Sequence, residues 1–443
     1  MKIQLSEHFT YPKLLRFVFP SVVMMIFTSI YGVVDGLFIS NFVGKTAFAA
    51  VNLIYPYLML LGCLGFVVGT GGSALVSKTM GEGDSRRANQ YFSMLVWVTA
   101  IAGIAVSAAG FLTLRPVSIL LGAQGDMVDQ CVLYGGIIMS AQTAFILQNA
   151  FQSFFVTAER PQLGLAVSVA AGVTNIVLDA LLVGVFRWGL AGAAAATALS
   201  EVVGGVVPLI YFLCPNSTRL RLTKARVDVR ALWRVLTNGS SELMTNVSMS
   251  LVNMLYNLQL VRLAGEDGIA AYGVIMYVNF VFAAIFLGYA VGSAPIISYH
   301  YGAEHHGELK NLLGKSLRLV AAAGTAMLVI AYTAAPALSG VFVGYDQGLR
   351  EMTRRAIQLY AVSYLLAGFN IFASSFFTAL NDGPVSAALA FLRTLVFQTS
   401  AVLLLPLVLE LDGVWLAITV AEALALAVSV GFLVGKRKIY HYA

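Results

Sequence analysis

The octapeptide GKTAFAAV at residues 44–51 returns as GEDGIAAY at residues 265–272, an offset of 221 residues. At the same offset Gly81 matches Gly302. A nearly constant offset between the two halves indicates that the chain contains two copies of one unit. Paired bundles of this kind are the usual construction of secondary transporters, whose binding sites lie between or within the halves.

The composition is that of a membrane protein. The chain has 443 residues, of which 59% are hydrophobic and only 11% are charged, whereas soluble proteins carry about 25% charged residues. Segments such as 317–343 and 414–434 are almost free of charge and reach the length of about 20 residues that a spanning helix needs. Because these runs are continuously apolar and do not alternate, they favour helices over barrel strands. We therefore predict an all-α polytopic membrane protein.

Twelve transmembrane helices are predicted, six in each half. Their expected positions are residues 17–42, 52–77, 91–114, 130–156, 163–185, 189–213, 237–262, 269–297, 318–342, 357–380, 385–408 and 413–434. The first six-helix lobe would occupy residues 1–214 and the second residues 235–443. A basic linker at residues 215–234 would join them.

The positive charges predict the orientation of these helices. Of the 27 Lys and Arg residues, 19 lie in the N-terminus, the even-numbered loops with the linker, and the C-terminus, and 7 lie in the odd-numbered loops. The positive-inside rule then places both termini and the linker in the cytoplasm of a multi-pass protein of the cell (inner) membrane. The net charge of +6 reflects this topology and the anionic inner leaflet. We expect no nucleic-acid binding, because the linker lacks interleaved aromatic residues, and we expect a monomer in the lipid bilayer.

Two acids, an amide and a hydroxyl of the first half are predicted to lie at one depth. Asp35, Asp179 and Thr197 lie six to eight residues from the outer ends of their helices, which is about 9–12 Å at roughly 1.5 Å per residue. Asn175 lies one turn from Asp179, on the same face. Ionisable groups in a membrane are costly and usually functional, and this set suits a shared proton or a Na⁺ ion. The alternative is that each acid only locks the bundle through hydrogen bonds.

A second polar group follows one face of the seventh predicted helix, at spacings of 4, 7 and 4 residues. This face could line a substrate cavity, with weaker candidates on the fourth helix, or it could serve only helix–helix hydrogen bonding at about 0.6 kcal/mol per contact. The candidate cavity residues are Glu242, Asn246, Met249, Asn253, Asn257, Gln148 and Gln152.

Three further features of the predicted helices lead to predictions. Arg393 needs an acidic partner within the membrane, for which Glu422 is the first candidate, while the role of Glu201 is open. Pro20 lies early in the first helix, where it removes a backbone hydrogen bond and should act as a kink or hinge.

No cofactor, metal site or enzymatic activity is expected. His300, His305 and His306 cluster where we expect a solvated cytoplasmic loop. The glycine-rich segment 69–73, placed at the end of the second helix, lacks the ending of a phosphate loop and is better explained by close helix packing. No nucleophile–base constellation or nucleotide motif stands out.

Over essentially its full length the chain resembles the multidrug and toxic compound extrusion (MATE) transporters, in particular their DinF-like and MepA-like bacterial branch. The resemblance lies in two six-helix halves joined by a cytoplasmic linker and in a Gly-x₄-Ala-Ala element at residues 44–50 and 265–271. Members of the DinF-like branch carry a helix 1 proline and aspartate, an Asn-x-x-x-Asp pair on helix 5 and a helix 6 threonine. The matching residues here are Pro20, Asp35, Asn175, Asp179 and Thr197.

The resemblance implies a V-shaped pair of lobes that alternate access and export amphipathic, often cationic compounds in exchange for H⁺ or Na⁺. Carboxylates that NorM-like members use on helices 7 and 10 are missing, since Ser250 lies near the helix 7 position and the middle of helix 10 has no acid. A lipid or lipid-linked oligosaccharide flippase of the same superfamily is the alternative. A membrane enzyme or an ion channel fits the duplicated chain less well.

Overall fold

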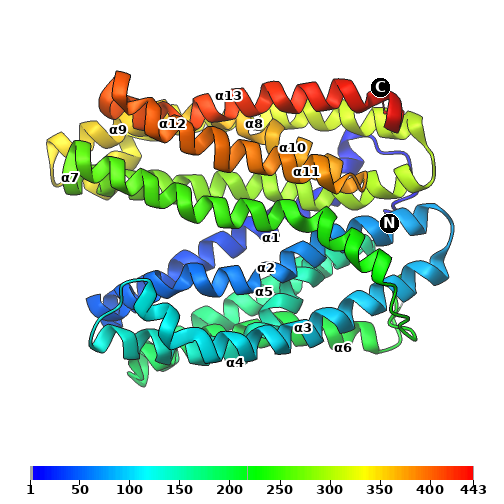
Figure 1. Ribbon diagram of the computed structural model, residues 1–443, viewed down its shortest axis with the longest axis horizontal. Coiled ribbons are helices and arrows are strands. Elements are labelled where there is room, and N and C mark those ends of the chain that lie inside the picture. The colour runs from blue at the N-terminus through cyan, green and yellow to red at the C-terminus, as the bar shows by residue number, and fades with distance from the viewer. Residues whose placement is uncertain (1–2, 217, 443) are drawn as a thin grey trace.

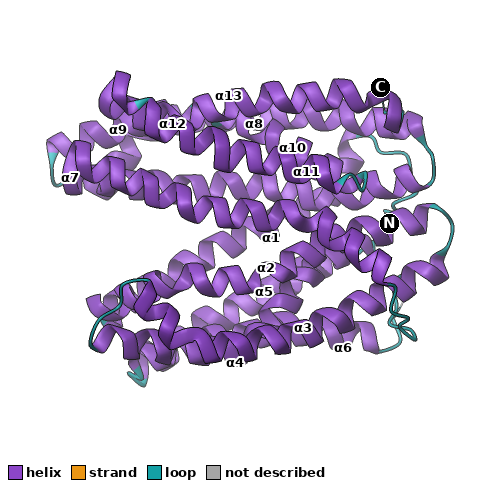
Figure 2. Ribbon diagram, in the orientation of Figure 1, coloured by secondary structure: helices purple, strands orange, loops and turns teal. Residues whose placement is uncertain are grey.

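The computed structural model describes residues 3–216 and 218–442. The outermost residues of the two predicted lobes and position 217 of the predicted linker therefore lie outside the described residues. Within the described ranges the regular structure is helical and contains no strand (Figure 2).

Six helices and two π-helical turns form the first half. They are α1 (Tyr11–Phe38), which continues into η1 (Ile39–Val43), α2 (Lys45–Gly81), α3 (Ser85–Leu120), α4 (Asp126–Thr157), α5 (Pro161–Leu178), which continues into η2 (Asp179–Val185), and α6 (Gly189–Leu213).

The second half begins with the longest helix. It comprises α7 (Val229–Gly302), α8 (His306–Val343), α9 (Gln347–Ala361), α10 (Tyr364–Ala379), α11 (Gly383–Ala390), η3 (Phe391–Gln398), α12 (Thr399–Leu404) and α13 (Pro406–Tyr440).

The number of spans agrees with the twelve that the sequence predicts. Ten helices in the described residues are long and apolar enough to cross a membrane, and α9 with α10, bent by 45°, makes an eleventh span. Gly265 interrupts α7 with φ 60° and ψ −141°, a conformation that favours glycine, so α7 contains two spans. The predicted all-α fold is therefore confirmed.

Most helices are longer than predicted. For example, α3 covers residues 85–120 where 91–114 was expected, and α7 starts at Val229, inside the predicted linker. Asp228 caps that start, since its carboxylate accepts a hydrogen bond from the Ala231 amide at 3.0 Å. The predicted bounds are shorter because hydropathy marks only the apolar run of each helix, whereas the helical hydrogen bonds of the backbone continue through the polar turns at each end.

The helices form two lobes arranged as a V (Figure 1). Helices α1–α6 build one lobe and α7–α13 the other. The two termini and the segment between α6 and α7 lie at the end where the lobes meet, on the right of the view, and the lobes diverge toward the opposite end. We call these the linker end and the open end. The charge distribution predicts that the linker end faces the cytoplasm.

Glycine lets the two lobes approach closely at the linker end. A Cβ atom on Gly81 would lie 2.0 Å from the carbonyl oxygen of Tyr299, and one on Gly302 would lie 2.0 Å from that of Lys78. These two contacts are related by the 221-residue offset of the repeat. Gly71 makes a similar approach to the Val235 carbonyl, at 2.3 Å. The expected close packing is thus observed, although residues 69–73 lie inside α2 and not at its end.

The N-terminal segment, residues 3–10, contacts both lobes at the linker end. The Leu5 amide donates to the Glu159 carboxylate at 2.9 Å, just after α4. The Phe9 amide donates to the Glu308 carboxylate at 2.9 Å, on α8. Leu5 and Phe9 are fully buried, so the segment is part of the packed structure at this end.

Candidate functional site

The predicted polar cluster of the first lobe comes together from three helices. Asp35 lies in the last turn of α1, Asn175 in the last turn of α5, and Thr197 in the middle of α6. The amide of Asn175 donates to the Thr197 hydroxyl at 3.4 Å, and this hydroxyl donates to the Asp35 carboxylate at 3.5 Å. Both distances are at the long limit of a hydrogen bond. The three side chains therefore surround a common space, and the hydrogen bonds between them are long.

Asp179 completes the cluster at the start of η2, one turn after Asn175. It is fully buried, and neither of its carboxylate oxygens receives a hydrogen bond from a donor of the described chain. The η2 turn that carries it packs against α1, the helix of Asp35.

The cluster has more acceptors than donors. Besides the two oxygens of Asp179, the buried side-chain oxygen of Asn175 lacks a donor. A buried acceptor without a partner costs about 1–3 kcal/mol, and more when it is charged. A proton or a small cation coordinated by oxygen atoms would supply the missing positive partner. The arrangement is therefore suited to binding and releasing such an ion.

Both acids lie beside π-helical turns, which the sequence did not indicate. The η1 turn follows the helix turn that holds Asp35, and η2 begins at Asp179. Such turns inside helices are frequently found at functional sites, because they shift the register of backbone hydrogen bonds. No residue type at residues 39–43 or 179–185 marks these turns.

A cavity of about 760 Å³ opens directly onto the cluster. Asp35, Asn175 and Thr197 line it, whereas Asp179 does not. Tyrosines of the first lobe and residues from the second span of α7 form other parts of the wall. Those residues include Tyr31, Tyr55, Tyr134, Glu201, Gly273, Met276, Tyr277 and Phe280. Among the lining residues that the structure describes, none is lysine or arginine.

The other predicted cavity residues do not line this space. On the first span of α7, the Asn246 amide donates to the Glu242 carbonyl of its own helix at 2.8 Å, and Asn253 accepts a hydrogen bond from the Tyr272 hydroxyl at 2.8 Å. Gln148 and Gln152 are buried within the first lobe. The remaining two, Met249 and Asn257, are exposed. A role of these seven residues in substrate binding stays a prediction.

Pro20 lies inside α1, and the helix runs through it without a break. It lies about four turns from Asp35, toward the linker end. Its expected role as a hinge also stays a prediction.

Arg393 finds the acidic partner expected for it. Its guanidinium donates to the Glu422 carboxylate at 2.7 and 2.9 Å, and the Asn370 amide donates to the same carboxylate at 2.7 Å. Ser429 in turn donates to Asn370 at 2.9 Å. This network lies wholly in the second lobe, and its charges and hydrogen bonds are satisfied internally. It therefore resembles a structural ion pair more than an open site.

The histidine cluster differs from the solvated loop that we expected. His300 is buried in the last turn of α7, with its Nδ1 atom 3.3 Å from that of His305. The expectation was wrong for His300 because α7 continues to Gly302. In the described part of the chain, no three His, Cys, Asp or Glu side chains are placed to hold a metal ion.

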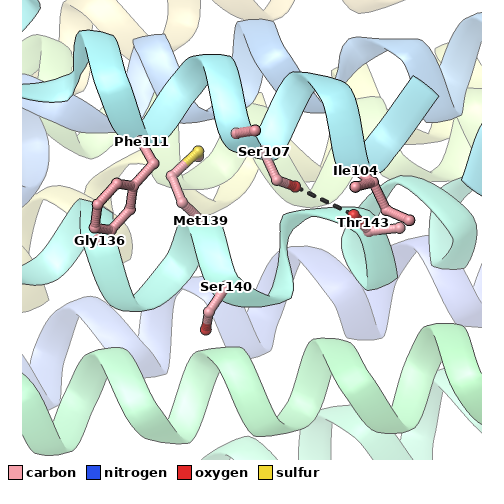
Figure 3. Close-up of a pocket in the computed structure, with 8 residues that line it drawn as sticks. Ile104, Ser107, Phe111, Gly136, Met139, Ser140 and Thr143 are labelled. Atoms are coloured by element: carbon pink, nitrogen blue, oxygen red, sulfur yellow. Dashed lines mark hydrogen bonds between the residues drawn. The ribbon is translucent and has the colours of Figure 1, made fainter. Parts of the chain in front are cut away.

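A smaller pocket of about 330 Å³ lies between α3 and α4 (Figure 3). Ser107 and Thr143 form a hydrogen bond of 3.2 Å across it, and Phe111 and Met139 form its apolar wall. None of its lining residues is ionisable. The chemistry needed to hold a cation therefore belongs to the larger cavity.

Comparisons with known proteins agree with this architecture. The MatE family model matches residues 20–181 and 243–402, one block in each lobe. Multidrug export protein MepA of Staphylococcus saprophyticus is 23% identical over 403 residues, covering 91% of this chain and 87% of that protein. The protein of the same name in Staphylococcus aureus is 22% identical over 414 residues, which cover 93% of this chain and 90% of that protein.

Among solved structures, the outward-facing conformation of a multidrug resistance MATE family transporter of the MOP superfamily superimposes with a TM-score of 0.90. It is 22% identical in sequence and covers 96% of this chain and 95% of the other. At this identity the likeness establishes the fold.

Proposed function

The chain belongs to the MatE family, and on that premise we propose that it is a multidrug exporter driven by the entry of H⁺ or Na⁺. The main support for ion coupling is the cluster beside the cavity, which is rich in hydrogen-bond acceptors and consists of Asp35, Asn175, Asp179 and Thr197. Its missing positive partner is the coupling ion. The relatives named multidrug export protein support export of small organic molecules as the transported class.

The proposed cycle is an exchange at the first lobe. With the V open to the outside, a proton or Na⁺ ion enters the cavity and binds between Asp35 and Asp179. This removes the repulsion between the two carboxylates and allows α1 to change shape around Pro20. The cavity then narrows and the organic substrate leaves outward. The membrane potential contributes about 2.3 kcal/mol per charge for each 100 mV.

In this proposal the protein acts as a monomer in the cell membrane, with both termini in the cytoplasm. The lobes part at the linker end in the second half of the cycle, so that substrate enters from inside. The contacts of Gly81 and Gly302 break at that step.

The chemistry of the cavity favours an exporter of cations over a flippase for anionic lipids. Asp35 and Glu201 line it, and none of the lining residues in the described part of the chain is lysine or arginine. A phosphate-bearing headgroup would meet negative charge and no cationic partner there. An amphipathic organic cation would instead find carboxylates and aromatic rings.

Ethidium efflux from proteoliposomes with an imposed pH or Na⁺ gradient tests this function. We expect wild-type protein to move the dye under one of the two gradients, which identifies the coupling ion. Asp35→Asn and Asp179→Asn should each abolish gradient-driven transport, because an amide cannot exchange a proton or provide a charge for Na⁺.

Asp129→Asn is the matched control for these variants. Asp129 lies in the first turn of α4, is 70% exposed and pairs only with the exposed Arg115. It should transport as wild type does. Full transport by both cluster variants would overturn the coupling mechanism, and no dye movement under either gradient would argue against multidrug export.

A further inference from the structure

Glu201 is a third acid of the cavity, with a different environment from the coupling pair. It lies on α6, one turn from Thr197 toward the linker end, and lines the cavity. Only 9% of its surface is exposed. One of its two carboxylate oxygens is buried without any hydrogen-bond donor in the described chain.

Glu422 shows how this protein stabilises a buried acid that has a structural role. Glu422 is also buried, but Arg393 and Asn370 surround it with donors. A buried carboxylate without a cation costs several kcal/mol. No such partner for Glu201 is present in the described part of the chain, so its position is explained more simply if the positive partner comes from outside the protein.

Aromatic rings line the same cavity as this acid. Tyr31, Tyr55 and Tyr134 are three of the residues that line it together with Glu201. A cavity that combines a carboxylate with aromatic rings suits organic ammonium and other delocalised cations, because such cations are attracted to the faces of aromatic rings. The cavity volume of about 760 Å³ is of the size that holds drug-like molecules, about 300–1,000 Å³.

A glycine next to the acid helps to shape this part of the wall. Gly204 lies three residues after Glu201 on α6, and a Cβ atom there would lie 2.3 Å from the side chain of Gln148. The absent side chain allows Gln148 of α4 to pack closely against α6.

We propose that Glu201, with Tyr31, Tyr55 and Tyr134, is the subsite that binds the positive charge of an organic cation. Asp35 and Asp179 are thereby left free for the coupling ion. The inference rests on the proposed export function and divides its two binding tasks between different acids. Substrate and coupling ion then do not need the same carboxylate, and binding of the substrate can be measured without transport.

Direct binding of tetraphenylphosphonium to the purified full-length protein in nanodiscs, by isothermal titration calorimetry, tests the subsite. Glu201→Gln keeps the shape of the side chain and removes its charge, so we expect the dissociation constant to rise at least tenfold. Glu201→Asp should recover part of the affinity. Glu266→Gln, at an exposed acid of α7, is the control for loss of one charge and should bind within about threefold of wild type.

Thermal unfolding of the same samples separates recognition from a structural role. If Glu201 only stabilised the bundle, Glu201→Gln would lower the melting temperature. If it is an unpaired binding group, the variant should be as stable as wild type or more so. A destabilised variant that still binds tetraphenylphosphonium with wild-type affinity would overturn the proposal.

The outcomes distinguish this inference from the proposed function. Unchanged affinity in Glu201→Gln, or no tetraphenylphosphonium binding by wild-type protein, would overturn the cation subsite. Gradient-driven ethidium efflux that fails in Asp179→Asn would still support the exporter in that case. Failure of wild-type efflux under both gradients would count against the exporter itself.

Discussion

The ion pair between Arg393 and Glu422 offers a quantitative test of how the second lobe is held together. The guanidinium and carboxylate approach to 2.7 Å, with Glu422 2% and Arg393 21% exposed at the side chain. Arg393→Met and Glu422→Gln each remove one charge and leave the other in place. The double variant removes both charges and keeps an amide oxygen near Asn370.

The two single variants should differ in their cost. Removing one partner of a buried pair costs about 3–5 kcal/mol, because the remaining charge has no compensation. Arg393→Met leaves a carboxylate that is almost entirely buried, so we expect about 5 kcal/mol. Glu422→Gln leaves a guanidinium with some access to its surroundings, so we expect about 3 kcal/mol. The double variant should cost less than either single one, because no unpaired charge remains.

Reversible unfolding in mixed micelles, titrated with sodium dodecyl sulfate, measures these free energies. Trp415 is buried on α13, the same helix as Glu422, and its fluorescence reports on unfolding of this lobe. Arg355→Met is the control, since Arg355 forms an exposed ion pair with Asp412, which should contribute about 1 kcal/mol or less. Single variants within about 0.5 kcal/mol of wild type, or a double variant equal to the sum of the singles, would refute the reasoning.

Two other outcomes are expected at the linker end. Gly81→Val places a side chain against the Tyr299 carbonyl, where even a Cβ would lie 2.0 Å away. Distances between spin labels on the two lobes at this end, measured by double electron–electron resonance, should therefore increase. An unchanged distance distribution would mean that this close approach does not hold the lobes together. Glu308→Ala removes the acceptor of the Phe9 amide. The backbone amides of residues 3–10 should then exchange hydrogen several-fold faster, as measured by mass spectrometry. Unchanged exchange rates would show that packing alone holds the segment.

The sequence by itself determined the membrane class, the duplication and the number of spans. These follow from long apolar runs and a constant offset, which need no knowledge of how helices pack. It also identified the cluster of Asp35, Asn175, Asp179 and Thr197, because the helical rise per residue is fixed and depth can therefore be counted along the chain. The pairing of Arg393 with Glu422 was predictable because a charge within the membrane needs a partner.

Only the tertiary structure decided which side chains share a cavity. Whether Glu201 or Glu242 faces that space depends on the rotation of each helix about its axis and on the neighbours it meets. Counting residues gives depth but not this rotation relative to other helices. The π-helical turns at residues 39–43 and 179–185 change it locally, and the second span of α7 reaches the cavity of the other lobe through contacts between residues far apart in the chain. The physical reason is that depth is a property of one helix, whereas a binding site is a property of several helices packed together.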